Sequence, residues 1–500
     1  MKKKDLVTLL LAGLAILIWS EKTFAEQSQV QKKQRNIIFI LIDDQRYDFL
    51  SFLNHPWIKT PNIDKLASNA MYFSNAFVTT SLCSPSRASI LTGQYAHSHQ
   101  VIDNDTPLPP SIPTFPKELQ KVGYKTAFLG KWHMGGENDM PRPGFDLWIS
   151  FKGQGSYNDP ELNINGERIQ RKGYTPDLLT DYACDFIKEN AHGDKPYFLY
   201  LSHKSVHEPF TPAKRHDHVY ENLKVPRPSS FEDTPENNQG KPEWAVKQRK
   251  SWHGSERPIL TEDDEYDKFF RQYSECMLGV DESIGRIEKT LAELGQLDET
   301  VIIYYSDNGY MMGEHGLIDK RVGYEESIRV PAFVHCPDLI KKPSVNDHFI
   351  LNIDIGPTIL DLAETSIPET MHGRSFLPLL KGEKSDWRDA FVYEYFIDHN
   401  AVQTPTIFGI RTKKYSYMTY HGVWDNYELY DLDKDPKEMN NLLGNVTYGL
   451  GYGTFLKYVH IEKPEVYDIV VPLENELNQM LNETGGSRTP KWVSAPQNNL

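Results

Sequence analysis

The sequence predicts an α/β fold: a large, mostly parallel sheet between helices, with a small antiparallel sheet near the C-terminus. Two observations support this. Unbroken apolar runs of strand length alternate with longer helix-like stretches, the order typical of parallel sheets. After about residue 386 the pattern changes to short aromatic segments in which apolar and polar residues alternate, as in antiparallel strands.

The predicted elements follow in chain order. The run Asn36–Asp43 has the composition of a strand buried on both faces. Further strands of the large sheet are predicted over 126–129, 197–202, 300–306 and 331–335. Helices are predicted between them over 62–70, 114–122, 177–190, 266–294 and 354–363. The C-terminal part is expected to hold strands over 391–396, 407–420 and 427–432, then a helix near 435–443.

Residues 1–25 have the pattern of a cleaved export signal. Three lysines at positions 2–4 precede the apolar run Leu6–Trp19, and small residues precede the expected cleavage after Ala25. As a helix the run rises about 21 Å, less than the ~30 Å hydrocarbon core of a bilayer. We therefore expect an exported protein, periplasmic or secreted, without a membrane anchor.

The rest of the chain is expected to divide into three parts. Residues 26–385 form the α/β domain, within which the polar, proline-containing segment 213–262 is interpreted as a surface excursion or lid. Residues 386–485 form a C-terminal subdomain, and residues 486–500 a tail.

Composition excludes some classes of function. Acidic residues outnumber basic ones by 69 to 54, a net charge of −15, which argues against nucleic-acid binding. Four cysteines are too few for a disulfide scaffold, and buried thiols are the simpler interpretation.

Polar residues follow several of the predicted strands. Asp43 and Asp44 come directly after the first strand, and Asp307 and Asn308 follow a later one. Ligands bind beyond the carboxyl ends of parallel strands, and clustered oxygen ligands suit Ca²⁺ or Mg²⁺. For each pair taken alone, helix capping or an Asx turn is the favoured interpretation, and the two pairs together make a metal site an equal alternative.

Cys83 has an unusual sequence context. It is flanked by serines, a proline and an arginine rather than by apolar residues, and Pro85 predicts that a helix begins here. The pattern Cys83-x-Pro85-Ser86-Arg87, followed by Leu91-Thr92-Gly93, resembles the signature of the type I sulfatases.

The resemblance extends from Asn36 to about Leu443 and implies an alkaline-phosphatase-like fold. It implies that a maturation enzyme oxidises Cys83 to Cα-formylglycine (3-oxoalanine). It also implies one Ca²⁺ per chain, held by residues that carry over onto Asp43, Asp44, Cys83, Asp307 and Asn308.

The resemblance also implies further site residues. Gly130-Lys131-Trp132-His133 is similar to the family's Gly-Lys-x-His motif, and segment 203–209 to the one that supplies another histidine, placed at His207. Lys320 matches a second sulfate-binding lysine. For each of these residues a solvated surface position or the hydrophobic core is the alternative.

In the implied chemistry, one hydroxyl of the hydrated aldehyde attacks sulfur, and loss of the proton from the second expels sulfate. Arg87, Lys131 and Lys320 neutralise the ester. His207 is expected to protonate the leaving alcohol, with Lys320 as alternative or helper, and His133 to act as base.

Weaker candidates for the site are His203, His97, His99, His315 and Glu314. Four aromatic residues are expected in the core or pocket wall: Tyr95, Trp132, Tyr310 and Trp148.

The predicted function is hydrolysis of sulfate esters on a carbohydrate. The segments 201–213 and 313–320 resemble those of N-acetylglucosamine-6-sulfatases and bacterial polysaccharide sulfatases. The substrate could be a glycosaminoglycan, a mucin glycan, or an algal polysaccharide such as ulvan or carrageenan. A phosphonate or phosphate monoester hydrolase and an inactive glycan-binding relative are the alternatives. The sequence leaves open the sugar, the sulfated position and the oligomeric state.

Overall fold

The computed structural model describes residues 34–257, 260, 263–422, 427–444, 447–448, 459–460 and 464–488. The predicted export signal and the last twelve residues of the predicted tail lie outside these ranges. Residues from Asn36 onward form one unit.

A ten-stranded sheet organises this unit, in the order β13-β2-β12-β9-β1-β8-β4-β5-β6-β7. Its five central strands are parallel, and β12 runs antiparallel to both neighbours. The central strands are β9 (Val301–Ser306), β1 (Ile37–Ile42), β8 (Tyr197–Ser202), β4 (Lys125–Lys131) and β5 (Leu147–Phe151). The outer ones are β13 (Ser344–Asn346), β2 (Ala70–Phe73), β12 (Phe333–His335), β6 (Glu161–Ile164) and β7 (Glu167–Gln170).

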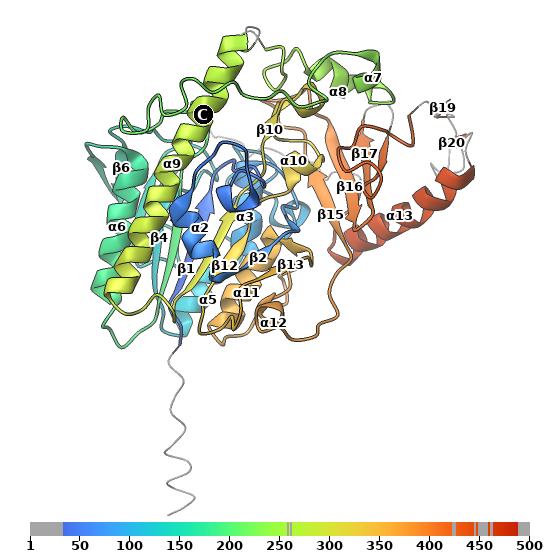
Figure 1. Ribbon diagram of the computed structural model, residues 1–500. Helices are drawn as coiled ribbons and strands as arrows, with labels where there is room; N and C mark the ends of the chain where they lie inside the picture. Colours follow the sequence, from blue (N-terminus) through green and yellow to red (C-terminus); the bar gives the residue numbers. More distant parts are fainter. Residues whose placement is uncertain are drawn as a thin grey trace, which may run out of the picture. The chain divides into compact units, whose positions relative to one another are not determined.

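Helices cover both faces of the sheet (Figure 1). Alternate residues of β1 point to opposite faces, so both faces of this strand are buried. Ile38, Ile40 and Ile42 pack with α2 (Pro61–Ala67), α6 (Thr175–Asn190) and α9 (Asp263–Glu293). Ile37, Phe39 and Leu41 share a core with α3 (Cys83–Thr92), α5 (Phe115–Lys121) and α11 (Ile355–Leu362). The α/β prediction and its main strands and helices are confirmed.

A second, antiparallel sheet follows near the C-terminus, as predicted, in the order β15-β16-β17-β18. These strands are β15 (Ala390–Tyr395), β16 (Thr406–Thr412), β17 (Tyr415–His421) and β18 (Glu428–Asp431). Helix α13 (Pro464–Glu483), which the sequence did not predict, packs on β15 and β16.

The predicted helix near 435–443 is wrong, because this segment forms turns. Polar side chains bind its backbone groups in place of helical hydrogen bonds. The Asp435 carboxylate accepts from Asn440 N at 2.6 Å. The Asn441 side chain accepts from Leu429 N at 2.9 Å, which ties the turn to β18.

The described residues of the excursion, 213–262, include the short helices α7 (Pro235–Asn238) and α8 (Glu243–Gln248). Its later part pairs with the hairpin β10 (Met311–Met312) and β11 (Ile318–Asp319) through a bridge between Gly254 and Leu317. Several of its polar side chains, Gln248 and Arg257 among them, are buried. Its role as a lid and the domain boundaries stay predictions.

The remaining short elements connect these parts. They are η1 (Ser51–Leu53), β3 (Ala76–Phe77), α4 (Ala96–His99), η3 (Glu314–Gly316), α10 (Glu325–Ile328), β14 (Ile350–Leu351), η4 (Asn352–Asp354), α12 (Leu377–Leu380), β19 (Thr447–Tyr448) and β20 (Val459–His460).

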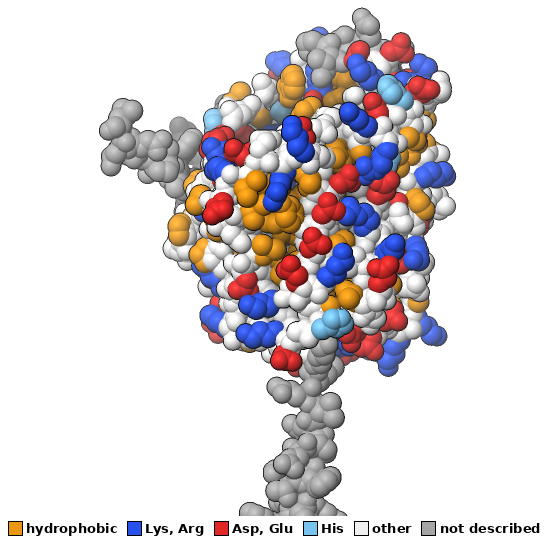
Figure 2. All heavy atoms as spheres, turned by 90° about the vertical axis from the view of Figure 1, so that its left-hand side faces the viewer, with side chains coloured by type: hydrophobic (Ala, Val, Ile, Leu, Met, Phe, Trp, Pro, Cys, Tyr) orange, Lys and Arg blue, Asp and Glu red, His pale blue; other side chains and the backbone are white. Residues whose placement is uncertain are grey.

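Acidic and basic side chains are interspersed over the face of the molecule that carries α6 (Figure 2). On this face the two signs of charge are therefore mixed. Across the described residues, the structure contains no helix that combines the length and apolar character needed to span a membrane.

Candidate active site

The candidate site lies where the carboxyl ends of β1, β4 and β9 meet the start of α3. Asp43 and Asp44 follow β1, Lys131 ends β4, and Asp307 follows β9. Because β1 pairs with β9 and with β8, which pairs with β4, the chain after each strand emerges at one edge of the sheet. Helix α3 begins at Cys83, so the prediction of a helix start there is confirmed.

The turn after β1 is held by hydrogen bonds from neighbouring strand ends. Asp44 has a left-handed backbone, φ 61°, which is uncommon for a residue other than glycine. Its amide donates to Asp307 Oδ1 at 3.0 Å. The amide of Asp43 donates to Ser205 O at 3.0 Å. These bonds keep the two adjacent carboxylates at the sheet edge.

Each of the three buried carboxylates contacts a buried cation. Lys131 Nζ lies 2.5 Å from Asp43 Oδ2, and Lys320 Nζ lies 2.6 Å from Asp44 Oδ2. The Arg87 guanidinium contacts Asp307 Oδ2 at 2.7 Å. The carboxylate charges, three negative, therefore match the three positive charges of these partners. This pairing offsets the cost of burying six ionic groups.

Burial and neighbouring charges shift the pKa values here in different directions. Burial raises the pKa of Asp307 to about 7, and the nearby Asp43 adds to this. Burial also acts on Asp43, but Lys131 and other cations hold the pKa of that carboxyl well below its usual range. Burial raises the pKa of Cys83, so its thiol stays protonated at neutral pH and is a poor nucleophile as it stands.

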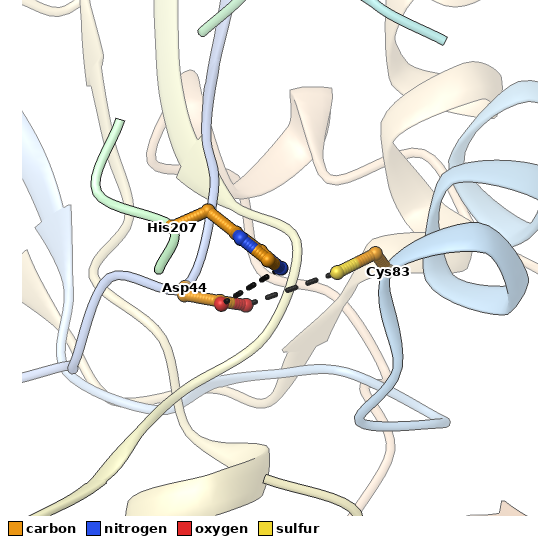
Figure 3. Close-up of side chains that lie close together, drawn as sticks. All are labelled: Asp44, Cys83 and His207. Atoms are coloured by element: carbon orange, nitrogen blue, oxygen red, sulfur yellow. Dashed lines mark hydrogen bonds and ion pairs between the residues drawn. The ribbon is translucent and has the colours of Figure 1, made fainter. Parts of the chain in front are cut away.

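Cys83 and His207 approach the same carboxylate from different segments (Figure 3). Cys83 Sγ lies 3.8 Å from Asp44 Oδ1 and 3.5 Å from Asp43 Oδ1. His207 Nε2 lies 3.7 Å from Asp44 Oδ2. The cysteine and the histidine thus lie on either side of one acidic group, within reach of a common substrate atom.

The donor set fits a hard divalent cation. Ligand atoms of Asp43, Cys83 and Asp307 lie within 4.8 Å of one another, as do those of Asp44, Cys83 and His207. Asn308 Nδ2 donates to Asp44 Oδ1 at 2.7 Å, while its Oδ1 is buried without a hydrogen-bond partner among the described residues. Carboxylate and amide oxygens at such distances are typical ligands of Ca²⁺ or Mg²⁺.

The structure places His133 beside the start of α3. Its backbone is left-handed, φ 66°, and its carbonyl accepts from the Ser84 hydroxyl at 3.3 Å. Burial and then the charge of Lys131 lower the pKa of His133 well below its ordinary value. Within the described chain, Nδ1 of His133 has no hydrogen-bond partner. This nitrogen of the neutral ring is therefore available to a further hydrogen-bond partner.

The weaker candidates lie away from the carboxylates. His203 Nε2 contacts Ser283 Oγ at 3.1 Å, and His99 Nε2 contacts Ser89 Oγ at 3.0 Å. His97 pairs with Glu394, and Glu314 with Arg46. His315 stacks on Tyr324, with ring centroids 4.1 Å apart. These residues serve packing and local ion pairs.

Sequence reasoning missed Lys204. Its side chain is buried, its Nζ lies 4.6 Å from the centre of the Tyr157 ring, and it has no hydrogen-bond partner among the described residues. The Tyr157 hydroxyl donates to His207 O at 2.8 Å, so this pair packs behind the histidine. The only sequence signal for Lys204 was its position inside segment 203–209, which was expected to supply His207.

The strand ends of this alkaline-phosphatase-like sheet bring together oxygen ligands, three cations and a cysteine. Such a site is typical of a hydrolase that acts on anionic esters. Comparison with known protein families identifies the family of hydrolases to which the chain belongs. The family described as "Sulfatase" matches residues 35–365, and "N-sulphoglucosamine sulphohydrolase, C-terminal" matches residues 313–450. The chain belongs to the sulfatase family and is a sulfuric ester hydrolase.

Three relatives illustrate the similarity. The N-acetylglucosamine-6-O-sulfatase of Bacteroides thetaiotaomicron is 32% identical, over 89% of this chain and 88% of its own. The N-acetylglucosamine-6-sulfatase of Capra hircus is 31% identical, over 92% and 90%. A solved structure described as a complex with its substrate D-glucosamine-2-N,6-O-disulfate is 30% identical, covers 91% and 98%, and has a TM-score of 0.80.

Proposed function

We propose that this protein is an exported sulfatase that removes a sulfate ester from a sulfated carbohydrate. The observation that carries the sugar assignment is the similarity, over nearly the whole chain, to a structure in complex with a sulfated glucosamine. Two N-acetylglucosamine-6-sulfatases at similar identity support the same substrate class. Export, to the periplasm or beyond the cell, rests on the pattern of residues 1–25.

Cys83 is proposed to be converted to Cα-formylglycine by a maturation enzyme. The buried thiol has a raised pKa, so an unmodified cysteine offers little thiolate for attack. When present, the modified side chain supplies a hydrated aldehyde whose hydroxyl attacks sulfur. The cysteine motif that begins α3 supports this proposal.

The metal is proposed to be one Ca²⁺, held by Asp43, Asp44, Asp307, Asn308 and the modified residue 83. When bound, it supplies positive charge to the sulfate oxygens. The three carboxylates are already balanced by three cations, so a dication leaves the site with an excess of two positive charges. This excess favours an anionic ester, such as a sulfate ester, over a neutral one.

The protein side chains then divide the remaining work. Arg87, Lys131 and Lys320 neutralise the sulfate oxygens as charge shifts during attack. His207 protonates the leaving alcohol through Nε2, the atom that lies 3.7 Å from Asp44. Burial and then the charge of Lys131 lower the pKa of this ring well below its ordinary value, with Asp43 opposing, so the step requires that the ring first takes up a proton. His133, kept neutral by burial, accepts the proton that is lost as the sulfated residue 83 breaks down.

The experiment measures the mass of the peptide that contains residue 83 in active protein made with its maturation system. Conversion of the cysteine lowers the mass by about 18 Da, because H₂S leaves and oxygen enters. Active protein with only unmodified cysteine would reject the modification.

A second experiment tests the substrate class. Sulfate release is measured from glucosamine 6-sulfate and from nitrophenyl sulfate, and hydrolysis of a phosphonate monoester is measured under the same conditions. Turnover of the phosphonate alone would favour the alternative hydrolase.

A further inference from the structure

The aromatic side chains that the sequence suggested near the site are all buried. Tyr95, Trp132, Tyr310 and Trp148 belong to the core, so none of them offers a ring face to a substrate. Trp252, in the excursion, is 59% exposed. In the described part of the chain only one other aromatic residue is comparably exposed, Tyr467 on α13. A single exposed hydrophobic side chain is common on protein surfaces, so the surroundings of Trp252 decide whether it has a role.

The backbone around Trp252 is fixed to the hairpin that carries Lys320. Ile318 N donates to His253 O at 2.8 Å, and Ser255 N donates to Gly316 O at 2.9 Å. The His253 ring contacts the Asp319 carboxylate through Nδ1 at 2.7 Å. Because Asp319 precedes Lys320 and His253 follows Trp252, the backbone that carries the indole is tied to the backbone that carries the lysine in contact with Asp44.

A second link joins Trp252 to the segment of His207. The Arg257 guanidinium lies 5.0 Å from the centre of the indole ring and donates to Trp252 O at 3.2 Å. The same guanidinium contacts Glu208 at 3.3 Å. Glu208 follows His207 directly. Arg257 is buried and covers one side of the indole, which leaves exposed surface on the remainder of the ring.

These two links attach the segment that carries a partly exposed indole to the segments of Lys320 and His207. A pyranose ring has a face of C–H bonds that packs on an aromatic ring, while its hydroxyl groups remain available to polar partners. The Arg257 guanidinium packs on one side of the indole and restricts the ring, so less conformational entropy is lost when a ligand packs on the other side.

We propose that Trp252 is a stacking platform for the pyranose ring of the substrate, and so a specificity-determining residue. This inference rests on the proposed action on sulfated carbohydrates. It assigns to the excursion a direct part in sugar binding. A small alkyl sulfate or inorganic sulfate, which lacks the ring, gains nothing from Trp252.

The kinetic test compares Trp252→Ala, Trp252→Phe and the matched control Tyr467→Ala, which removes the other exposed aromatic residue. With glucosamine 6-sulfate, Trp252→Ala is expected to raise KM about tenfold, equivalent to about 1.4 kcal/mol. Trp252→Phe should restore most of the loss, and Tyr467→Ala should match the wild type. The inhibition constant of inorganic sulfate should be the same in all four proteins, which shows that the sulfate site is intact. An unchanged KM in Trp252→Ala would overturn the proposal.

A binding measurement separates this inference from the proposed function. Glucosamine without sulfate is titrated into the wild type while tryptophan emission is recorded, because an exposed indole responds to a sugar packed on it. A saturable change in the wild type that is lost in Trp252→Phe is expected. A change that persists in that variant would overturn the platform. If the wild type hydrolyses nitrophenyl sulfate but no sugar sulfate, the proposed substrate class fails, whatever the emission shows.

Discussion

Among the described residues, two of the clusters of buried charge differ in their balance. At the strand ends, Asp43, Asp44 and Asp307 each contact a cation. The other, which we call the junction cluster, consists of Lys241, His315, Glu326 and Glu438. It lies where the excursion, the β10–β11 hairpin, α10 and the segment after β18 come together. Here two carboxylates and one imidazole share a single lysine.

The contacts in the junction cluster are made across these segments. Lys241 Nζ donates to His315 Nδ1, and Glu438 accepts from Glu325 N at 2.9 Å. Burial, followed by the charge of Glu314, raises the pKa of Glu326 to about 8. Burial also raises the pKa of Glu438 well above its usual value, and lowers that of Lys241 to about 8.

The comparison shows two outcomes of burying carboxylates. Where each carboxylate contacts its own cation, that charge favours the ionised form, although burial still raises the pKa of Asp44 and raises that of Asp307 to about 7. Such a cluster can accept a metal ion and an anion. Where cations are too few, the carboxyl groups keep their protons, so the folding equilibrium depends on pH. Substitutions at the strand ends should therefore affect catalysis most, and substitutions in the junction cluster should affect stability.

The largest effect is expected from Asp307→Asn, which unbalances the strand-end cluster. It neutralises a proposed metal ligand and the partner of Arg87, so activity should fall about 10⁴-fold. Metal analysis of the purified protein should show that bound calcium falls in parallel. Asp347→Asn is the matched control, since this carboxylate is almost fully exposed. Retention of calcium and activity in Asp307→Asn would contradict the proposed ligand set.

The next effect concerns His207 as proton donor. For a sugar sulfate, whose alkoxide leaves poorly, His207→Ala should lower kcat/KM about 10³-fold. A nitrophenolate leaves readily without a proton, so nitrophenyl sulfate should lose far less. Measuring both substrates gives the ratio directly. Equal losses on the two substrates would remove the acid role from His207 and shift it to Lys320.

His133→Ala should give a smaller loss, about 10²-fold, on both substrates alike. If His133 drives breakdown of the sulfated residue 83, the variant should still release one burst of alcohol. Intact-mass measurement during turnover should then find protein about 80 Da heavier than the hydrated form. A variant that shows neither the burst nor the heavier species would contradict the base role.

The strand-end cluster could be predicted because its information is local in sequence. An apolar run followed by Asp43-Asp44 identifies a buried strand and what lies at its end, and the motif at Cys83 identifies the start of a helix. The sheet then brings these ends together without further information. The sequence predicted which cationic residues would lie at the site, but it did not predict which carboxylate each of them contacts. The pairing of Lys131 with Asp43, for example, depends on the order of the strands in the sheet.

The junction cluster and Trp252 could not be predicted in this way. Lys241 and His315 are 74 residues apart and meet only because a loop without regular periodicity packs on the hairpin. The same long-range packing explains the wrong helix near 435–443, where the Asn441 side chain bonds to β18. Local sequence pattern therefore predicts the reactive residues at the strand ends, whereas the packing of loops determines the surface that contacts the substrate.

The smallest effect is expected from Glu326→Gln, which tests the junction cluster through pH. The folded pKa of Glu326 is raised to about 8, above the ~4.3 of an exposed glutamate, so the folded state binds a proton that the unfolded state lacks. Stability should therefore fall as pH rises between these values.

The groups that face Glu326 are Glu314, Glu325, Arg46, Lys241, His315 and Glu438. Loss of the Lys241 proton acts mainly above pH 8 and with the opposite sign, so the measurement stays between pH 5 and 7.5. With calcium present throughout, the fall in Tm over this range should be about 1–3 °C smaller in Glu326→Gln than in the wild type. The exposed Glu383→Gln serves as control and should follow the wild type. Parallel Tm curves for Glu326→Gln and the wild type would show that this carboxyl is charged in the folded protein, and that the junction cluster is balanced after all.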